Sequence, residues 1–238
     1  MIIAKWYNEA SQEWVVYHRG FNGGTDPEDY GAYLNTTMAP INEASFWYDT
    51  APTSTNFTIG NNLNSTYGGG GKYIAYIFAH DTASDGLIQC GSYTTDGNED
   101  ATVTLGWKPQ WLLVKRSDSS AAGDWRIIDS VRGVTAAGDA AWLEANTADA
   151  EAQTGVDRYT FTNTGFTQDN FGANRQYIYM AIRANAATDS AITWPTSIKW
   201  PAGVAPTTPV PGKKDLFTFL TTDGGTTYYG KKAAEGIA

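Results

Sequence analysis

The chain has 238 residues, enough for one large or two small domains, and carries a formal charge of -9. This acidic balance argues against sequence-independent nucleic-acid binding and against a polybasic membrane patch, because both need clustered lysine and arginine. With 9 tryptophans, 14 tyrosines, 25 glycines and only 17% charged residues, the composition is typical of an all-β protein with a polar, uncharged surface.

Cysteine and hydropathy exclude further classes. Cys90 is the only cysteine, so neither an intrachain disulfide nor a zinc site built from several thiolates can form. No apolar run approaches the roughly 18 residues that a bilayer-spanning helix needs. The first residues, MIIAKWYNEA, are too short and too polar for a signal peptide. We therefore expect a soluble protein made in a reducing cytoplasm.

The first 80 residues contain four predicted strands, at 2–4, 14–17, 56–59 and 72–78. Residues 56–59 alternate as a half-buried strand does, and 72–78 form a nearly continuous apolar run that predicts burial on both faces. Between them, FNGGTDPEDYG at 21–31 has the composition of turns throughout.

Residues 81–110 connect this region to the next. We predict one strand at 87–93 and another at 101–107, where Val103, Leu105 and Trp107 share a face. The Asp-Gly pair in TDGNED at 95–100 predicts a turn between these strands.

Four further strands are predicted at 112–115, 125–129, 158–162 and 176–182. The stretch 140–153 is rich in helix formers and predicts a short helix or an irregular turn. A long helix is disfavoured, since Pro40 lies in the corresponding part of the first 80 residues.

The composition changes after residue 185. Five of the 9 prolines fall between 195 and 211, which predicts an extended strap because proline fixes φ and lacks a backbone donor. Residues 215–220 and 226–229 then flank Asp-Gly-Gly, a strong signal for a C-terminal hairpin.

The region 111–183 repeats the beginning of the chain, and the landmarks occur in the same order in both copies. The matched pairs are Lys5 with Lys115, Trp14 with Trp125, Arg19-Gly20 with Arg132-Gly133, Leu34 with Leu143, Phe57 with Phe166, and Tyr76 with Tyr179. The spacing from Leu to Phe is identical in the two copies. We interpret this pattern as an internal duplication.

Catalytic motifs are weak. GGGGK at 68–72 is followed by Tyr73 rather than the Ser or Thr of a phosphate-binding loop, so a hairpin turn is the better interpretation. His18 and His80, the 2 histidines, are not repeated between the copies, which argues against a Ser-His-Asp triad and against a metal site.

Acidic residues near the landmarks could in principle hydrolyse glycosides in pairs, but surface solvation and turn capping are favoured. The candidates are Glu13, Asp124, Glu144 and Glu151. The loops DTASDG at 81–86 and TDGNED at 95–100 are acidic enough for calcium, but neither fits the EF-hand pattern, so solvated turns are preferred.

Aromatic residues in or beside polar loops could stack on sugar rings, although core capping or subunit packing is favoured for each one. They are Trp6, Tyr7, Trp47, Tyr48, Tyr67 and Tyr93. The repeated Arg19 and Arg132 are expected to form structural ion pairs or to bind carbonyls, and the glycine after each predicts a turn with positive φ.

Residues 86–186 resemble a repeat found in structural proteins of tailed phages, and residues 1–80 resemble a partial earlier copy. The resemblance rests on GSYTTDG (91–97), VTLGWKPQWLLVKRSDSS, DWRIIDSVRG, WLEANTADAE, TNTGFTQDN and YIYMAIR. The C-terminal DLFTFLTTDGGTTYYGKKAAEGIA is similar to the ends of many tail-fibre-like proteins. The resemblance implies a virion-associated protein with a concanavalin-like β-sandwich, and it supplies no catalytic residue.

The chain departs from that pattern at its beginning, because the first copy starts at Ile2 without the GSYT and VTLGW strands that precede Lys115. If those strands complete a sheet, the first copy has an unpaired edge, which proteins normally cover. We predict that the C-terminal hairpin or a neighbouring subunit fills it.

The sequence thus predicts an all-β chain of tandem concanavalin-like or jelly-roll-type β-sandwich repeats. The domains are 1–85, lacking its leading strands, 86–186, and 187–238 with the Pro-rich strap and C-terminal hairpin. We expect a phage tail-fibre or tail-tip component, made in the host cytoplasm and located in the virion. The alternatives are a capsid decoration protein and, in the enzyme class, a glycan depolymerase.

The expected partners are further copies of the chain, other virion proteins and host glycan, with no nucleic acid and no membrane insertion. We expect no enzyme activity, no catalytic residue, no metal and no cofactor, and the sequence assigns no ligand-binding residue.

Overall fold

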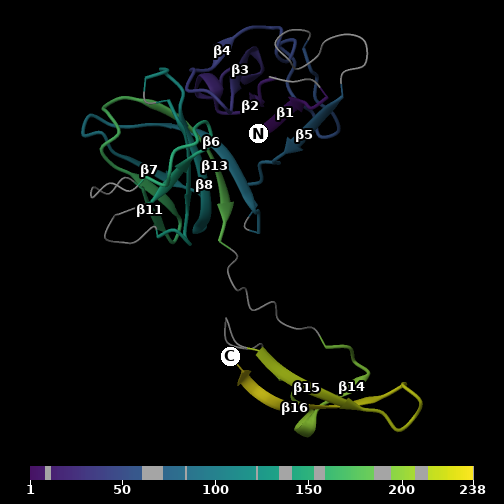
Figure 1. The fold of residues 1–238 in the computed structure, drawn as a ribbon. Helices are drawn as coiled ribbons and strands as arrows, with labels where there is room; N and C mark the ends of the chain where they lie inside the picture. Colours follow the sequence, from purple (N-terminus) through teal and green to yellow (C-terminus); the bar gives the residue numbers. More distant parts are fainter. Residues whose placement is uncertain are drawn as a thin grey trace. The chain divides into compact units, whose positions relative to one another are not determined.

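A computed structural model describes residues 1–8, 12–60, 72–83, 85–121, 123–133, 141–152, 159–184, 194–206 and 214–237. The regular structure in these residues consists of β-strands and three short 3₁₀ helices, so the chain is all-β, as its composition predicted. It divides into two compact units, Met1–Ala184 and Asn185–Ala238, both drawn in Figure 1. No helix within the described ranges is long and apolar enough to cross a membrane.

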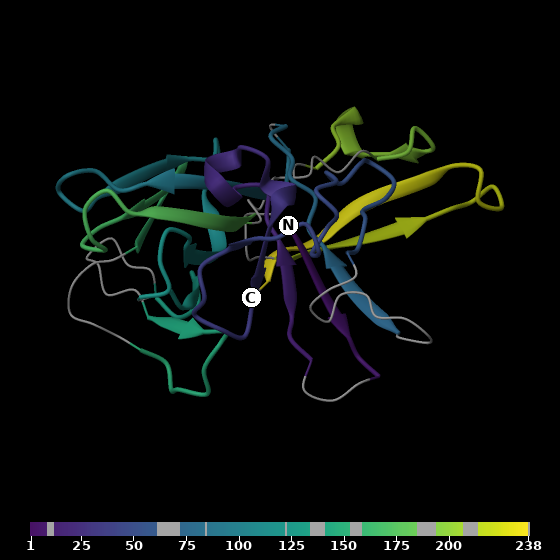
Figure 2. The ribbon, with the colours of Figure 1, turned by 90° about the horizontal axis from the view of Figure 1, so that it is seen from above.

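The first repeat forms an antiparallel sheet in the order β4-β3-β2-β1-β5. Its strands are β1 (Ile2–Trp6), β2 (Val15–Tyr17), β3 (Tyr30–Tyr33), β4 (Ile41–Asn42) and β5 (Tyr73–Ile77). The 3₁₀ helices η1 (Phe21–Gly24) and η2 (Pro27–Asp29) connect β2 to β3, in agreement with the predicted turns. We call this five-stranded layer sheet A. Seen from above in Figure 2, β2, β1 and β5 follow one another, with β5 outermost.

The second repeat contributes two more antiparallel sheets. Sheet C has the order β10-β9-β8-β13-β6, and sheet D has the order β11-β12-β7. The strands are β6 (Ile88–Thr94), β7 (Ala101–Thr104), β8 (Pro109–Arg116), β9 (Trp125–Asp129), β10 (Trp142–Glu144), β11 (Tyr159–Thr162), β12 (Gly165–Gln168) and β13 (Gln176–Arg183).

Sheet C is the middle of three layers, because its two faces enter different cores. Along β8, Leu112 and Val114 pack against sheet D, together with the predicted face of Val103, Leu105 and Trp107. The intervening residue on β8 points to the opposite core, which it shares with β1 and β2 of sheet A. A strand buried on both faces reads as an apolar run rather than an alternation, as WLLV does here.

In the part of the chain that the structure describes, the other face of sheet A is covered by loops rather than by a second sheet. Phe46 and Trp47 are fully buried there, and Phe57 packs against them. The predicted strand at 56–59 is wrong: Thr53 and Asn56 close a turn, and the next residues lie over the sheet without a ladder of their own. Their alternation reflects one apolar side facing this core.

The two repeats share one strand order, because β3-β2-β1-β5 in sheet A matches β10-β9-β8-β13 in sheet C. Trp14 and Trp125 occupy equivalent positions, as predicted. The Nζ atom of Lys5 lies 4.8 Å from the Trp14 ring centroid, and that of Lys115 lies 5.2 Å from the ring centroid of Trp125.

Asparagine side chains repeat as well, although the sequence comparison did not single them out. The amide oxygen of Asn35 accepts from the Trp14 backbone N–H at 3.0 Å, and that of Asn146 accepts from the Trp125 N–H at 2.8 Å. Each amide nitrogen donates to the acidic residue before the tryptophan. The same pair of side-chain hydrogen bonds therefore occurs at the equivalent place in both repeats.

Two predicted pairs are wrong in register. Leu34 donates its backbone N–H to Trp14 and Ala145 donates to Trp125, so Leu34 corresponds to Ala145 rather than to Leu143. Lys5 faces Ile74 while Lys115 faces Ile178, so Tyr76 corresponds to Met180 and lies one position away from the equivalent of Tyr179. In both cases a residue of the same type lies one or two positions from the true counterpart.

Phe57 and Phe166 agree better with the prediction, since each follows a four-residue turn. In the first turn, Thr53 accepts the Asn56 N–H through its hydroxyl and donates its own N–H to Asn56. In the second, Thr162 pairs with Gly165. Both phenylalanines pack on the side of their sheet away from the shared core.

Two further predictions need correction. The stretch 140–153 contains strand β10 and a turn rather than a helix, because Trp142 pairs with Ile128 and is buried in the core. The run 72–78 does form strand β5, but residues 74–77 are exposed rather than buried on both faces. β5 is the last strand of sheet A, and β1 is its only neighbour within the described residues.

The second unit contains a small three-stranded sheet, ordered β14-β16-β15. Strands β15 (Lys214–Leu220) and β16 (Tyr228–Ile237) are antiparallel, which confirms the predicted hairpin, and β14 (Ile198–Lys199) runs parallel to β16. Trp194 and Trp200 pack edge to face against Phe217, forming an aromatic core. The Pro-rich segment is not simply extended, since η3 (Pro201–Gly203) turns it; residues 207–213 lie outside the described ranges.

Candidate functional site

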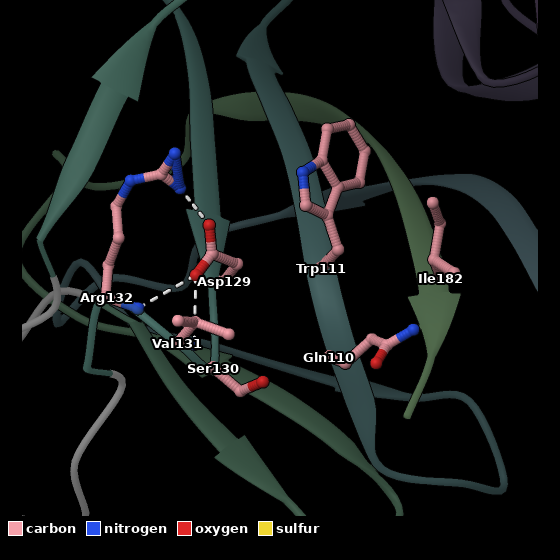
Figure 3. A pocket seen from close by; sticks show the side chains of 7 residues that line it. All are labelled: Gln110, Trp111, Asp129, Ser130, Val131, Arg132 and Ile182. Atoms are coloured by element: carbon pink, nitrogen blue, oxygen red, sulfur yellow. Dashed lines mark hydrogen bonds and ion pairs between the residues drawn. The ribbon is translucent and has the colours of Figure 1, made fainter. Parts of the chain in front are cut away.

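The candidate site is a shallow pocket of about 490 Å³ where β8, β9 and β13 end together. Gln110 and Trp111 come from β8, Ile182 comes from β13, and the turn after β9 supplies the opposite wall. Figure 3 shows the Trp111 ring and Ile182 on one side, with Asp129 and Arg132 on the other. The ladder places them together, since Trp111 pairs with both Asp129 and Ile182.

Hydrogen bonds to one carboxylate hold the turn that forms the pocket wall. An Oδ1 atom of Asp129 accepts the backbone N–H groups of Val131 and Arg132, both at 2.9 Å. The Arg132 guanidinium forms an ion pair with the other oxygen of Asp129, and its Nε lies 3.1 Å from Glu151. This confirms the predicted structural ion pair for Arg132. The wall is therefore preorganised, with its acceptor already occupied by protein donors.

The pocket offers an aromatic ring, aliphatic side chains and a rim of amide and hydroxyl groups. An indole face binds the apolar face of a ring-shaped polyol, while amide and hydroxyl groups exchange hydrogen bonds with its hydroxyls. Val131, which is 93% exposed, extends the apolar surface. The arrangement can thus hold an uncharged ligand without providing a free acid and base. The sequence pointed to other aromatics and missed Trp111, because it lies inside an apolar strand.

Comparisons with known proteins bear on the first unit. A family described as a domain of unknown function (DUF7483) matches residues 1–185. The chain belongs to the DUF7483 family. No curated protein and no solved structure matches it. The matched span coincides with the compact unit Met1–Ala184, so the DUF7483 domain contains both repeats and their shared core.

The two histidines of the DUF7483 domain act as hydrogen-bonding bridges between the repeats. His18 is fully buried; its Nε2 lies 2.9 Å from the Tyr179 carbonyl oxygen, and its Nδ1 accepts the Gly20 N–H at 3.0 Å. Burial lowers the pKa of His18 to about 3, so the ring is neutral. His80 accepts the Cys90 N–H through Nδ1 at 3.1 Å, and burial lowers its pKa as well.

Gly20 needs its small size for the same contact. A Cβ atom there would lie 2.7 Å from the backbone carbon of Gly91. The expectation of positive φ is wrong for Gly20, whose φ is -94°, and correct for Gly133, whose φ is 105°. Gly20 thus allows the first repeat to approach β6 closely.

Lys115 also connects the repeats. Its Nζ donates to the carbonyl oxygens of Thr37, at 3.2 Å, and of Gly123. Burial lowers the pKa of Lys115 to about 8, against the opposite effect of nearby Asp124. With Trp125, whose indole N–H donates to the Tyr33 carbonyl at 2.9 Å, it fastens sheet A to sheet C.

The predicted acidic candidates are occupied in local structure. Glu13 and Asp124 accept the repeated asparagine amides, Glu144 accepts the Trp142 indole N–H at 3.4 Å, and Glu151 pairs with Arg132. These contacts agree with a turn-capping role.

The acidic loops are organised by their own carboxylates. Asp81 accepts the Ala83 N–H at 2.8 Å, and Asp96 accepts the N–H groups of Asn98 and Asp100 at 2.8 and 3.0 Å. These backbone hydrogen bonds lower the pKa of Asp96. Among the residues that the structure describes, no three acidic, histidine or cysteine side chains are grouped to hold a metal ion. Residues 68–71 of the glycine run lie outside those ranges, and the strand predicted after them is β5.

The aromatics proposed for sugar stacking separate into two groups. Trp47 is buried, so a surface role for it is wrong. Tyr93 is half-buried and packs against the core, stacked on Tyr177 at a centroid distance of 5.3 Å. Tyr7 and Tyr48 are exposed, and Trp6 is half-buried. Tyr67 lies outside the described residues.

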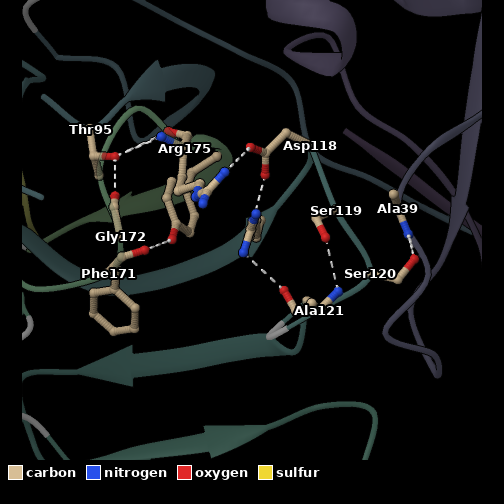
Figure 4. A network of polar contacts seen from close by, with 12 residues as sticks. Ala39, Thr95, Asp118, Ser119, Ser120, Ala121, Phe171, Gly172 and Arg175 are labelled. Atoms are coloured by element: carbon tan, nitrogen blue, oxygen red, sulfur yellow. Dashed lines mark hydrogen bonds and ion pairs between the residues drawn. The ribbon is translucent and has the colours of Figure 1, made fainter. Parts of the chain in front are cut away.

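A polar network at the opposite end of β8 completes the connections (Figure 4). Asp118 lies 2.5 Å from Arg116 and 4.0 Å from Arg175, joining the ends of β8 and β13. From the same loop, the Ser120 hydroxyl accepts the Ala39 backbone N–H at 3.1 Å. This network fixes a loop between the repeats.

Proposed function

We propose that the chain is a structural component of a tailed-phage virion, in a tail fibre or tail tip, and that it presents a surface for host glycan. The virion assignment follows the resemblance of residues 86–186 to the phage repeat. The glycan-contacting site is the pocket that Trp111 lines.

The observation that supports the proposal best is how the chain uses its buried and half-buried ionisable groups. His18 and Lys115 bind backbone carbonyls across the two repeats, and Asp129 holds the pocket wall. Groups committed in this way stabilise a rigid block and are not poised for proton transfer. A protein that transmits force and displays a surface needs such a block.

Immunogold electron microscopy of purified particles tests the virion assignment. Antibodies raised against the full chain should label the tail, and antibodies pre-absorbed with the protein provide the control. Labelling spread over the capsid would favour a decoration protein instead. Particles that carry no label and no peptides of this chain by mass spectrometry would overturn the proposal.

The glycan part is tested separately with the full chain on surface polysaccharide of the host. Trp111→Ala should reduce retention by about tenfold, as expected for a lost ring contact of roughly 1 kcal/mol or more. Tyr7→Ala, an exposed aromatic outside the pocket, is the matched control and should bind normally. Equal binding by all three proteins would contradict the pocket assignment, and release of reducing sugar would favour a depolymerase.

A further inference from the structure

We propose that the Trp111 pocket is selective for a neutral sugar that carries an acetamido group, and that Val131 contacts the methyl of that group. The inference rests on the proposed glycan-binding function, because it names the class of sugar that the same pocket binds. Val131 is then the residue that determines specificity, while Trp111 supplies affinity for any sugar ring.

Val131 is exposed to solvent and yet held in one place. It is 93% exposed, although it lines the pocket. Its backbone N–H donates to the Oδ1 atom of Asp129 at 2.9 Å, and so does the N–H of Arg132. The apolar side chain is therefore presented from a turn that is already ordered. A ligand that covers it buries apolar surface at little cost in backbone entropy.

The first repeat shows what packing alone requires at this position. After β2, the Nδ1 atom of His18 accepts the N–H of Gly20 at 3.0 Å. Asp129 makes the equivalent contact with Val131, so Gly20 and Val131 occupy the same place in the two turns. A Cβ atom on Gly20 would lie 2.7 Å from the backbone carbon of Gly91, so β6 leaves no room for a side chain there.

Val131, by contrast, keeps most of its surface in water. Folding thus requires a glycine in the first repeat and makes no comparable demand on residue 131. An apolar side chain on an ordered turn beside a pocket serves ligand contact, which is why we assign Val131 to the ligand rather than to the core.

The pocket has two apolar walls, with polar residues between them. Trp111 and Ile182 form one wall, and Val131 belongs to the other (Figure 3). Gln110 and Ser130 are neighbours at the strand ends, since the Ser130 N–H donates to the Gln110 carbonyl oxygen at 2.9 Å.

This arrangement matches the shape of an acetamido sugar. A hexose ring stacked on the indole of Trp111 projects its substituents away from that wall. An acetamido group reaches further from the ring than a hydroxyl group and ends in a methyl, which meets Val131. Its amide N–H and C=O are a donor and an acceptor, which the side chains of Gln110 and Ser130 can both satisfy.

Charge favours a neutral sugar over an acidic one. Arg132, which lines the pocket, pairs with both Asp129 and Glu151. Two carboxylates share one guanidinium, so the balance of charge at this wall is negative. The wall therefore repels the carboxylate of an acidic sugar, whereas an acetamido group carries no charge.

Isothermal titration calorimetry of the full chain with matched trisaccharides tests the selectivity. Triacetylchitotriose and cellotriose have the same linkage and differ in the acetamido group, and a trisaccharide of glucuronic acid is the acidic probe. Triacetylchitotriose should bind about tenfold more tightly than cellotriose, as expected for one buried methyl and one amide hydrogen bond. The acidic trisaccharide should bind more weakly than either.

Variants then assign the selectivity to Val131. Val131→Thr replaces one methyl by a hydroxyl with little change of shape, and it should reduce the preference by about fourfold. Val131→Leu keeps the wall apolar and should retain the preference. Trp111→Ala should weaken both neutral sugars alike. Val204→Thr, at an exposed valine that does not line the pocket, is the matched control and should change neither. Circular dichroism and the unfolding midpoint check that each variant folds.

The outcomes separate this inference from the proposed function. If neither the trisaccharides nor host polysaccharide binds, the glycan function fails and the inference fails with it. Retention on host polysaccharide without binding of triacetylchitotriose would overturn the inference alone. Equal binding of the two neutral trisaccharides, or a full preference in Val131→Thr, would remove the role of Val131 and leave the glycan function standing. Tightest binding of the acidic trisaccharide would overturn the selectivity for neutral sugars.

Discussion

Sheets A and C descend from one pattern but differ in what surrounds them. Sheet C has a β-sheet on each face and a strand on each side of β13. Within the described ranges, sheet A has loops over one face, and its last strand β5 pairs with β1 alone. Equivalent side chains should therefore contribute differently to the free energy of unfolding. A residue in sheet C should contribute more to stability than its counterpart in sheet A. Ionisable groups should be perturbed most where they are buried between the two repeats, whichever repeat they belong to.

The strongest test of this difference is the repeated tryptophan. Trp125 is 1% exposed in the shared core, while Trp14 is half-buried. Trp125→Ala should lower the free energy of unfolding by about 3–5 kcal/mol, and Trp14→Ala by about 2 kcal/mol, because less area returns to water. Urea unfolding followed by far-ultraviolet circular dichroism measures both losses. Equal losses would mean that the two tryptophans contribute equally to stability despite their different burial.

His18 sharpens the comparison, because its counterpart at the end of β9 is Asp129. Both side chains accept the backbone N–H two residues ahead, yet only the histidine is buried between the repeats. Its pKa in the folded chain, about 3, lies below the ordinary 6.5. Below pH 6.5 the unfolded chain binds a proton at this histidine and the folded chain does not. The free energy of unfolding is therefore unaffected by His18 above that pH and falls as the pH decreases below it.

We expect a loss of about 2–3 kcal/mol by about pH 4.5 from this group. His18→Gln keeps a donor and an acceptor but does not titrate, so its stability should be flatter between these pH values. The lowered pKa of His80 contributes in the same direction and remains in the variant. Identical pH profiles for the two proteins would show that His18 is not held neutral.

Lys115 allows the same comparison of stability with pH in the alkaline range. Burial lowers the folded-state pKa of Lys115 to about 8. Between that value and its ordinary 10.5, the folded chain releases a proton that the unfolded chain retains, so stability should rise with pH. A rise of about 2 kcal/mol is expected between pH 8 and about 10. Lys115→Met should abolish this rise and Lys5→Met should not, as measured by urea unfolding at each pH.

The sequence predicted most of the longer strands, the duplication and the repeated Lys and Trp landmarks, because each depends on local alternation or on large side chains in fixed order. It missed β3, β4, β10, β12 and β14. It did not predict the register of Tyr76 or Leu34, since a one- or two-residue shift leaves the residue types looking aligned. It also misjudged β5. An apolar run predicts burial, but which strand lies at the edge of a sheet depends on a partner elsewhere in the fold.

The sequence did not predict the candidate pocket, for a related reason. Trp111 lies in the apolar run of β8, where the sequence gives no sign that the strand end opens to solvent. The landmark Arg132 was recognised only as an ion pair, and its place in the pocket wall depends on the turn that Asp129 holds. Pairing across three strands, rather than proximity in sequence, brings these residues together.

The smallest expected difference concerns the repeated asparagines, which the ladder revealed. Asn146 is partly buried and Asn35 is exposed, although both accept a tryptophan N–H and donate to an acidic side chain. Removing a buried partner leaves a backbone donor unsatisfied, while water replaces an exposed one. Asn146→Ala should therefore cost about 1–2 kcal/mol and Asn35→Ala about 0.5 kcal/mol or less. Asn146→Asp keeps the acceptor but places its charge beside Asp124, so it should not restore full stability. If Asn35→Ala proved the more destabilising change, sheet A would depend on this turn more than sheet C does.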